Sequence, residues 1–257
     1  MNKLSVLITG ASSGIGLELA KEFAQHGHSV LLLARSTQRL EQLTQELRTN
    51  FKVRAELVQA DLSKPNAPAQ VAEELNRRNL AVDILVNNAG FGLLGPYGKL
   101  DLQQQIDMIQ VNVTALAHLT RLFLPGMIQR NFGGVLNVSS IAAYQAGPNM
   151  AIYYATKAFV LAFTEALHEE VSGTNLHVSC LCPGPTHTGF AAAANMEGSN
   201  LFKFGAQSAN EVAKFGYAAY QRNQAIAIPG LKNKLLAIAA KLSPRIMSRK
   251  SAMALNR

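Results

Sequence analysis

The sequence predicts an α/β protein whose parallel sheet is covered by helices on both faces. Short runs of β-branched and leucine residues alternate with longer stretches of helical periodicity along most of the chain. Continuous apolar strands separated by helices are typical of parallel sheets, whose strands are buried on both sides. Of the 257 residues, 48% are hydrophobic and only 16% are charged, which predicts a large core and little disorder.

Each strand is expected at a short apolar run and each helix at an amphipathic stretch between two runs. The expected strands are residues 5–9, 29–34, 53–59, 82–87, 134–139, 177–182 and 224–228. The expected helices lie near residues 15–26, 37–49, 65–79, 103–129, 151–172 and 208–222. Ser208 and Glu211 form a capping-box pattern at the start of the last of these helices. The chain has no internal repeat or linker, so we expect one domain over residues 1–257.

The first apolar run is too short for a signal peptide and leads into a glycine-rich turn, so we interpret it as a strand. No apolar stretch is expected to reach the roughly 20 residues that span a bilayer. Cys180 and Cys182 are the only cysteines, and we expect ordinary buried thiols rather than a disulfide. These features predict a cytoplasmic location.

The net charge of +8 is concentrated near the C-terminus. Residues 212–257 hold nine Lys or Arg and no Asp or Glu, whereas the first 211 residues hold fifteen basic and sixteen acidic residues. A basic balance confined to one segment does not by itself indicate nucleic-acid binding. We expect no nucleic-acid partner, because the charge comes with no recognised module, and no metal, because no ligand spacing is present.

A glycine-rich turn, TGASSGIG, joins the first strand to its helix. Gly10, Gly14 and Gly16 let the backbone turn tightly and approach a pyrophosphate, which the helix N-terminus then binds. Arg35 ends the second strand, where an acidic residue would hold the ribose of NAD, and its guanidinium suits the 2′-phosphate of NADP instead. Arg39 either adds a second positive charge or belongs to an exposed helix face. NADP is therefore the expected cofactor.

The chain closely resembles the short-chain dehydrogenase/reductase family in an ordered set of motifs. These are TGASSGIG at 9–16, NNAG at 87–90, Asn112, the serine pair at 139–140 and YxxxK at 153–157. The resemblance runs from residue 4 to about 190. It implies a single Rossmann-type, doubly wound domain with a seven-stranded parallel sheet, and hydride transfer between NAD(P) and a carbonyl or alcohol. Residues 190–257 form the variable substrate-loop and basic C-terminal region, and a homodimer or homotetramer is expected.

The resemblance implies four catalytic residues: Asn112, Ser140, Tyr153 and Lys157. Ser140 is preferred to Ser139 because it lies thirteen residues before Tyr153, the family's usual separation. Tyr153 would donate the proton, and Lys157, on the same helix face, would lower its pKa. Ser140 would bind the substrate oxygen, and Asn112 would link Lys157 to solvent through water. The same residues also suit a surface pair, a strand-end cap and a helix irregularity.

The expected cofactor residues come from the glycine turn and from the resemblance. Asp61 is expected at the adenine amino group, residues 88–90 on the adenosine side, and the segment 183–188 around the nicotinamide. His187 in that segment is expected to line the pocket or loop. The full set is Gly10, Ser12, Ser13, Gly14, Ile15, Gly16, Arg35, Asp61, Leu62, Asn88, Ala89, Gly90, Tyr153, Lys157, Pro183, Gly184, Thr186 and Thr188.

The expected walls of the substrate pocket are residues 91–97, 141–150 and 190–204. They are mostly small and apolar, and the bulky members of the third wall are Phe190, Met196, Phe202 and Phe204. This composition favours a lipophilic carbonyl compound, with an acyl chain, a steroid-like ring or an aromatic ketone, over a sugar. The same side chains would alternatively pack inward as a lid.

The C-terminal region contains a basic amphipathic pattern. Leu231, Leu235, Ile238 and Leu242 fall on one helical stripe with lysines beside them, and Pro244 interrupts the pattern. Such a helix suits contact with an anionic membrane. It equally suits a subunit interface or a cover over the protein's own pocket.

The sequence therefore leaves two hypotheses for the function of this protein. The first is an NADPH-dependent carbonyl reductase acting on a lipophilic ketone or 3-oxoacyl-type substrate. The second is a catalytically silent NADP-binding regulatory or scaffold protein, because a fold does not fix a function. The presence of all four catalytic residue types favours the enzyme, and the sequence leaves the reaction direction open.

Overall fold

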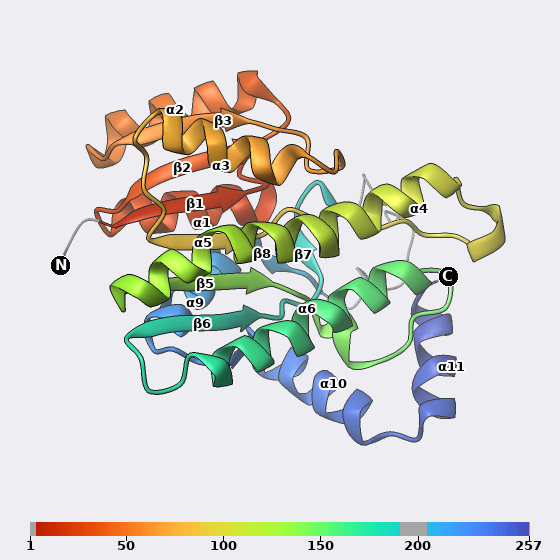
Figure 1. Cartoon of the computed structure of the whole chain (residues 1–257). Helices are drawn as coiled ribbons and strands as arrows, with labels where there is room; N and C mark the ends of the chain where they lie inside the picture. Colours follow the sequence, from red (N-terminus) through yellow and green to blue (C-terminus); the bar gives the residue numbers. More distant parts are fainter. Residues whose placement is uncertain (1–3, 191–204, 257) are drawn as a thin grey trace.

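The computed structural model describes residues 4–190 and 205–256, and a single parallel sheet forms its centre (Figure 1). The strand order is β3-β2-β1-β4-β5-β6-β9, and every neighbouring pair is parallel. The order reverses between β1 and β4, where doubly wound folds bind their ligands. The strands are β1 Ser5–Thr9, β2 Ser29–Ala34, β3 Ala55–Gln59, β4 Ile84–Asn87, β5 Gly133–Val138, β6 Leu176–Leu181 and β9 Ile226–Ala227, and a separate pair joins β7 Thr186–His187 to β8 Gln207–Ser208.

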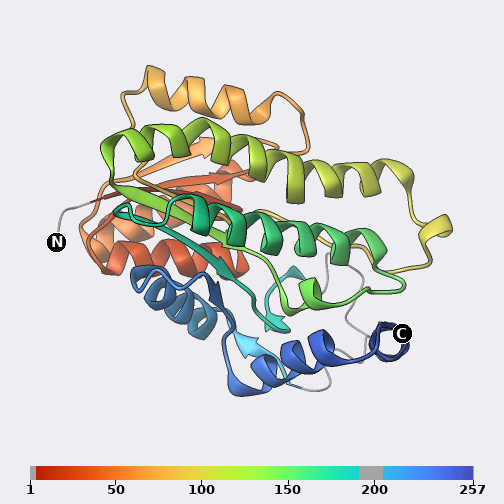
Figure 2. The same ribbon diagram turned by 60° about the horizontal axis from the view of Figure 1, so that its bottom comes forward.

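Helices cover both faces of the sheet (Figures 1 and 2). Val6 and Ile8 of β1 pack with α1, α2 and α9, whereas Leu7 points to the opposite face and packs with α3, α5 and α6. This alternation buries each central strand on both sides. The helices are α1 Gly14–Gln25, α2 Thr37–Phe51, α3 Ala67–Arg77, α4 Leu102–Ile109, α5 Leu116–Arg130, α6 Ala151–Glu170, α9 Ala209–Gln221, α10 Leu231–Leu242 and α11 Arg245–Leu255, with short turns η1 Tyr97–Lys99, η2 Gln110–Ala115 and η3 Ile141–Tyr144.

The predicted fold class is confirmed, and every predicted strand lies within two residues of an observed one. The capping box of Ser208 and Glu211 is present at the start of α9. Cys180 and Cys182 are buried free thiols. The helical stretch expected near 103–129 is confirmed as the run Leu102–Arg130, in which the π-helical turn η2 lies between α4 and α5.

The helical run Leu102–Arg130 is long and apolar enough, by length and composition alone, to cross a membrane. The expectation that no segment would reach this length is therefore wrong. In the structure, Leu119, Leu124 and Met127 of this run are buried in the core against the sheet. The α5 part of the run therefore packs against the sheet, whereas Leu102 and Ile106 of α4 are exposed.

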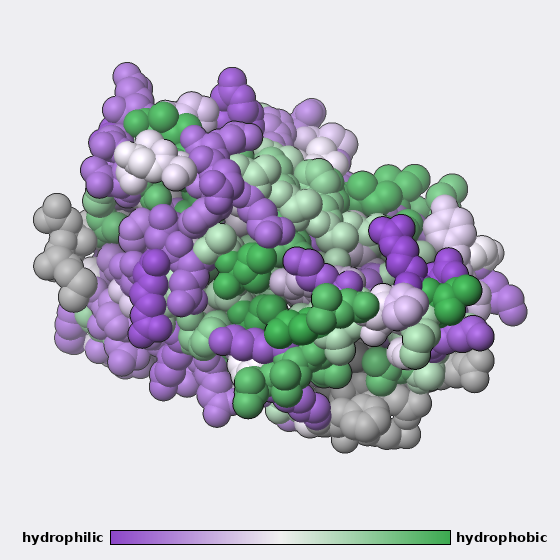
Figure 3. All heavy atoms as spheres, turned by 90° about the horizontal axis from the view of Figure 1, so that it is seen from below, coloured by the Kyte–Doolittle hydropathy of each residue, from purple (hydrophilic) through white to green (hydrophobic). Residues whose placement is uncertain are grey.

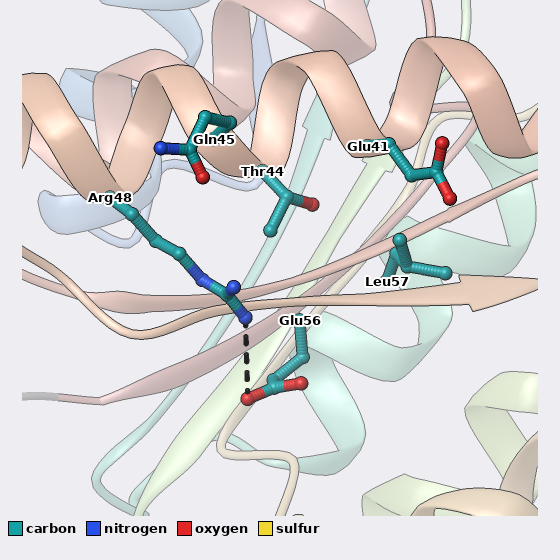
Figure 4. A pocket seen from close by; sticks show the side chains of 6 residues that line it. All are labelled: Glu41, Thr44, Gln45, Arg48, Glu56 and Leu57. Carbon is teal, nitrogen blue, oxygen red and sulfur yellow. Dashed lines mark ion pairs between the residues drawn. The ribbon is translucent and has the colours of Figure 1, made fainter.

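A hollow of about 290 Å³ lies between α2 and the edge strand β3 (Figure 4). The Arg48 guanidinium reaches across it to the carbonyl oxygen of Ala55 at 3.0 Å and lies 3.7 Å from the Glu56 carboxylate. It is lined by Glu41, Thr44, Gln45, Arg48, Glu56 and Leu57. None of these residues belongs to the predicted site. The polar side chains of α2 that line the hollow lie over the edge strand β3.

Candidate active site

The first turn of α6 brings Tyr153 and Lys157 together. The Lys157 Nζ atom lies 5.8 Å from the centre of the Tyr153 ring. It donates a hydrogen bond of 2.9 Å to the carbonyl oxygen of Val138, the last residue of β5. Lys157 is buried, with 6% of its surface exposed, whereas Tyr153 keeps part of its surface open. The carboxyl end of β5 therefore holds the lysine next to the tyrosine ring.

The two neighbouring serines at the end of β5 have different partners. Ser139 Oγ is buried and donates a hydrogen bond of 2.7 Å to the carbonyl oxygen of Lys157, so it secures α6 against the sheet. Ser140 Oγ accepts from the Ala142 N–H at 3.1 Å, and its side chain forms a hydrogen bond with Tyr153. Of the two, Ser140 is the serine that lies against the tyrosine hydroxyl.

Burial has the largest effect on the pKa values of Tyr153 and Lys157. It raises the pKa of Tyr153 above its usual range, although the hydrogen bond with Ser140 partly opposes the shift. Burial also lowers the pKa of Lys157 to about 8. Lys157 is not among the groups that shift the pKa of Tyr153 here, so its expected lowering of that pKa stays a prediction for the enzyme with its cofactor bound. Tyr153 therefore carries its proton at neutral pH.

Asn112 lies in the π-helical turn η2, a type of distortion that is frequent at functional sites. Its side-chain amide pairs with the backbone of Phe91, accepting from the N–H at 3.1 Å and donating to the carbonyl at 3.0 Å. It also donates to Thr156 Oγ1 at 3.1 Å, and that hydroxyl donates to the carbonyl oxygen of Tyr153. A Cβ added to Gly90 would lie 3.0 Å from Asn112 Oδ1 and 3.4 Å from Lys157 Nζ. Gly90 thus separates the asparagine from the lysine.

The glycine turn after β1 is closely packed against its surroundings. Gly10 and Gly14 have φ of +67° and +57°, a left-handed conformation that favours glycine. A Cβ on Gly14 would lie 3.0 Å from the side chain of Thr188. A Cβ on Gly16 would collide with the Asn88 side chain and the Gly10 carbonyl. The turn therefore needs its glycines to fit between α1 and the loops after β4 and β6.

A pocket of about 520 Å³ opens beside this turn at the start of α1. Ser13 caps the helix without a side-chain hydrogen bond, so N–H groups of the first turn are available to an anion. The geometry fits the phosphates of a dinucleotide, and Arg39 brings a positive charge to the same space. The pocket is lined by Ser12, Ser13, Gly14, Leu17, Glu18, Arg39, Gln42, Leu43, Glu46, His187, Thr188 and Ala209.

Arg35 and Asp61 lie near one another at the ends of β2 and β3. Burial alone would raise the pKa of Asp61, but hydrogen bonds from Ser63 and the charges of Arg35 and Lys64 lower it below its usual value. Asp61 is therefore ionised and able to accept a hydrogen bond from an amino group. Leu62, another expected cofactor residue, has its side chain in the core.

The segment after β6 connects the cofactor side of the site to the catalytic side. The Pro183 carbonyl accepts from the Ile141 N–H at 3.0 Å, and Thr186 Oγ1 donates to the Gly184 carbonyl at 2.9 Å. Thr188 Oγ1 accepts from the Phe190 N–H at 3.2 Å. At the end of this segment, the Phe190 ring centre lies 5.4 Å from that of Tyr153.

An apolar wall surrounds the tyrosine. Ala142, Met150 and Tyr154 form a buried cluster, and Leu94, Tyr153 and Phe190 pack against it. Members therefore come from each of the three segments expected to form the substrate pocket. Met196, Phe202 and Phe204 lie outside the described residues.

Sequence reasoning missed several residues that hold the site together. Thr9 Oγ1 accepts hydrogen bonds from the N–H groups of Asn88 and Ala89, both at 2.9 Å. The buried amide of Asn87 donates to Asn137 Oδ1, and Asn137 donates to Thr164 Oγ1. Thr9 and Asn87 begin the motifs at 9–16 and 87–90, whereas the only signal of Asn137 and Thr164 in the sequence is a polar residue within an apolar strand or helix. Across 4–190 and 205–256, the structure shows no group of three metal-ligand side chains.

Comparison with known proteins shows the family of this chain. The family model for short chain dehydrogenases matches residues 4–198. A probable NADP-dependent dehydrogenase of Haemophilus influenzae is 37% identical over 185 residues, which is 72% of each chain. The human very-long-chain 3-oxoacyl-CoA reductase is 34% identical over 69% of this chain, but the match spans only 57% of that relative. The structure of a short-chain dehydrogenase from Sphingobium yanoikuyae with NADPH superposes with a TM-score of 0.82 and 33% identity, covering 89% of this chain and 88% of that one.

Proposed function

This chain belongs to the short-chain dehydrogenase family and is an NADP-dependent oxidoreductase, and from that premise we propose that it reduces a lipophilic ketone or a 3-oxoacyl-type substrate. The observation that carries the proposal is the position of Tyr153. Its protonated hydroxyl is bonded to Ser140, lies above Lys157, and stands in an apolar wall.

In the proposed reaction, Ser140 and Tyr153 bind the carbonyl oxygen of the substrate. When bound, NADPH supplies the hydride that the chemistry requires. Tyr153 gives its proton to the oxygen as negative charge develops there, and a donor placed at that position lowers the barrier. Burial raises the pKa of Tyr153, so the hydroxyl holds its proton at neutral pH and can donate it.

We assign the phosphates of NADPH to the glycine turn and the start of α1, and its 2′-phosphate to the side of Arg35 and Arg39. The pocket beside the turn supports this placement, because Arg39 lines it together with Ser12 and Ser13. Both acidic side chains that line the pocket have partners. Glu46 pairs with Lys21 at 2.7 Å, and Glu18 accepts a hydrogen bond from Asn210 at 2.9 Å.

The lipophilic substrate is supported by the apolar wall around Tyr153 and by the activity named for the human relative. The test is NADPH oxidation by the purified protein against matched acyl, steroid and aromatic ketones, with a ketose sugar as the polar control. We expect turnover of at least one lipophilic class and a far lower kcat/KM for the sugar. Reduction of the sugar alone would overturn the substrate assignment.

The single-domain organisation, the homodimer or homotetramer and the cytoplasmic location remain predictions. Sedimentation of the purified protein across a range of concentrations tests the oligomer. Fractionation of cells that express the full chain tests the location.

A further inference from the structure

The two C-terminal helices expose their hydrophobic residues. Leu231, Leu235 and Leu242 of α10 are 73%, 58% and 78% exposed, and Ile246 at the start of α11 is 60% exposed. The buried residues of α10 are Asn233 and Ala237. Within residues 4–190 and 205–256, the stripe that the sequence identifies therefore faces solvent and does not pack against the core.

The orientation of α10 is fixed by its small, polar side. Asn233 Nδ2 donates to the Pro229 carbonyl and to Gln207 Oε1, both at 2.8 Å. Its side chain fills the space left by the missing Cβ of Gly184. A rotation that buried the leucines would break these bonds and push larger side chains against Gly184. The exposed stripe is thus a consequence of how the helix is anchored.

The second helix is anchored in the same way. Ser248 and Ala252 form the buried side of α11, while Ile246 and Met247 are exposed. At its end, Asn256 Nδ2 donates to the Pro148 carbonyl at 2.8 Å. Figure 2 shows α10 and α11 along one side of the molecule, and in Figure 3 hydrophobic side chains gather on that side with hydrophilic ones beside them.

The charged residues of α10 and α11 all have one sign. Residues 231–256 contain six Lys or Arg and no Asp or Glu. At about 100° per residue, the four stripe residues of α10 lie within roughly 60° of each other, with Lys232 on one flank and Lys234 and Lys241 on the other. Lysines beside an apolar stripe extend their charges toward lipid head groups while their stems remain among apolar groups.

Other exposed apolar residues, on α4 and α5, provide a comparison. Leu102, Ile106 and Leu122 are exposed there, with Asp101 and Asp107 on either side of the first two in the chain and the exposed Arg121 beside the third. That region therefore carries charges of both signs. The stripe of α10 and α11 is accompanied by basic residues alone, which matches an anionic surface.

We propose that α10 and α11 bind the protein peripherally to an anionic lipid bilayer, with the exposed leucines in the interface and the basic residues at the head groups. The same surface ends beside Asn256, which contacts Tyr154 next to the catalytic tyrosine. Docking would therefore bring the apolar wall of the site near the bilayer, from which a lipophilic substrate could enter. The entry of substrate from the bilayer rests on the proposed function, whereas membrane binding does not.

The test is flotation of the full-length protein with phosphatidylcholine vesicles that contain or lack phosphatidylserine. We expect the protein to float with the anionic vesicles and to remain behind with the neutral ones. Added salt should weaken the binding, because it screens exposed charges beyond about 10 Å at 0.1 M. Absence of flotation with both kinds of vesicle overturns the proposal.

Two variants separate the apolar and the charged contributions. Leu231→Gln/Leu235→Gln/Leu242→Gln should lower the partition coefficient by at least about tenfold, because three side chains lose favourable burial in the interface. Lys234→Gln/Lys241→Gln should lower it by roughly fivefold per charge removed. Since all five side chains are exposed, neither variant should change the melting temperature.

The matched control is Leu102→Gln/Ile106→Gln/Leu122→Gln, which removes the same number of exposed apolar side chains from the α4–α5 face. It should float like the wild type, and equal loss in both triple variants would overturn the assignment to α10 and α11. If the α10 variant instead dissociates an oligomer while the wild type does not bind vesicles, a second copy covers the surface and the proposal is wrong.

Reduction of a water-soluble ketone should be equal in the wild type and the α10 variant. Vesicle binding without turnover of any ketone by the wild type would refute the proposed function alone.

Discussion

The adjacent tyrosines of α6 predict opposite outcomes for the same substitution. Tyr153 is bonded to Ser140 and lies over Lys157, whereas the Tyr154 hydroxyl donates to Asn256 Oδ1 at 3.3 Å in a buried position. Changing either residue to phenylalanine removes one oxygen atom and leaves the ring in place. The pair is therefore a matched test of which hydroxyl serves catalysis.

Tyr153→Phe should lower kcat by about 10²–10⁴-fold, the range that general acid catalysis contributes. Its effect on stability should be small, because Ser140 Oγ keeps its bonds to the Ala142 N–H and the Pro183 carbonyl. NADPH should still bind, since the glycine turn and the basic side chains are unchanged.

Tyr154→Phe should act on stability instead. It removes one buried hydrogen bond, which costs on the order of 1 kcal/mol. For a protein of this size, that lowers the melting temperature by about 2–4 °C. Its kcat should stay within a few-fold of the wild type, because the Tyr154 hydroxyl bonds to Asn256 rather than to a proposed catalytic residue.

The assay is steady-state NADPH oxidation with a ketone that the wild type reduces, together with thermal unfolding and a fluorescence titration with NADPH. Equal losses of kcat in the two variants would refute the asymmetry. So would a Tyr153→Phe enzyme that keeps more than about a tenth of the wild-type kcat.

Four further predictions follow from other parts of the site. Arg35→Asp should raise the KM for NADPH by about 10–100-fold, the value of one charged hydrogen bond, and leave the KM for NADH lower or unchanged; unchanged preference for NADPH would refute the role of Arg35. Gly16→Ala should abolish NADPH binding by titration, because its Cβ meets Asn88, whereas Gly98→Ala, with open space around it, should bind normally. The kcat/KM for reduction should fall as pH rises through about 8, since the Lys157 ammonium loses its proton there, and a flat profile across this range would contradict that role. Asn256→Ala should lower the melting temperature by several degrees, and a double-mutant cycle with Tyr154→Phe should be non-additive because the two side chains share a bond.

The sequence predicts the sheet well because each strand is a continuous apolar run. In β1 and β2, residues on both sides are buried, so the run itself marks the strand and its ends. The helix near 103–129 is harder, because apolar periodicity cannot reveal the wider π turn that carries Asn112. The motif identifies the asparagine, but only the fold shows its pairing with Phe91 and Thr156.

The pKa of Tyr153 shows a second limit of sequence reasoning. The i and i+4 spacing places Lys157 on the correct helix face, and the distance of 5.8 Å agrees with that expectation. The pattern does not report how deeply either group is buried. Burial is the largest influence on both side chains, and it raises the pKa of Tyr153 and lowers the pKa of Lys157.

The C-terminal stripe shows why a helical pattern alone does not assign a partner. Periodicity identifies Leu231, Leu235 and Leu242 as one face, and most such faces turn toward the core of their own protein. Here the close contact between Asn233 and Gly184 sets the orientation of α10, because it requires the side of the helix that carries Asn233 and Ala237 to face inward. A contact of one asparagine with one glycine thus leaves the leucines outside, beside basic residues and near the tyrosine wall. The same anchoring explains why the apolar surface and the site that would use a lipophilic substrate lie on one side of the molecule.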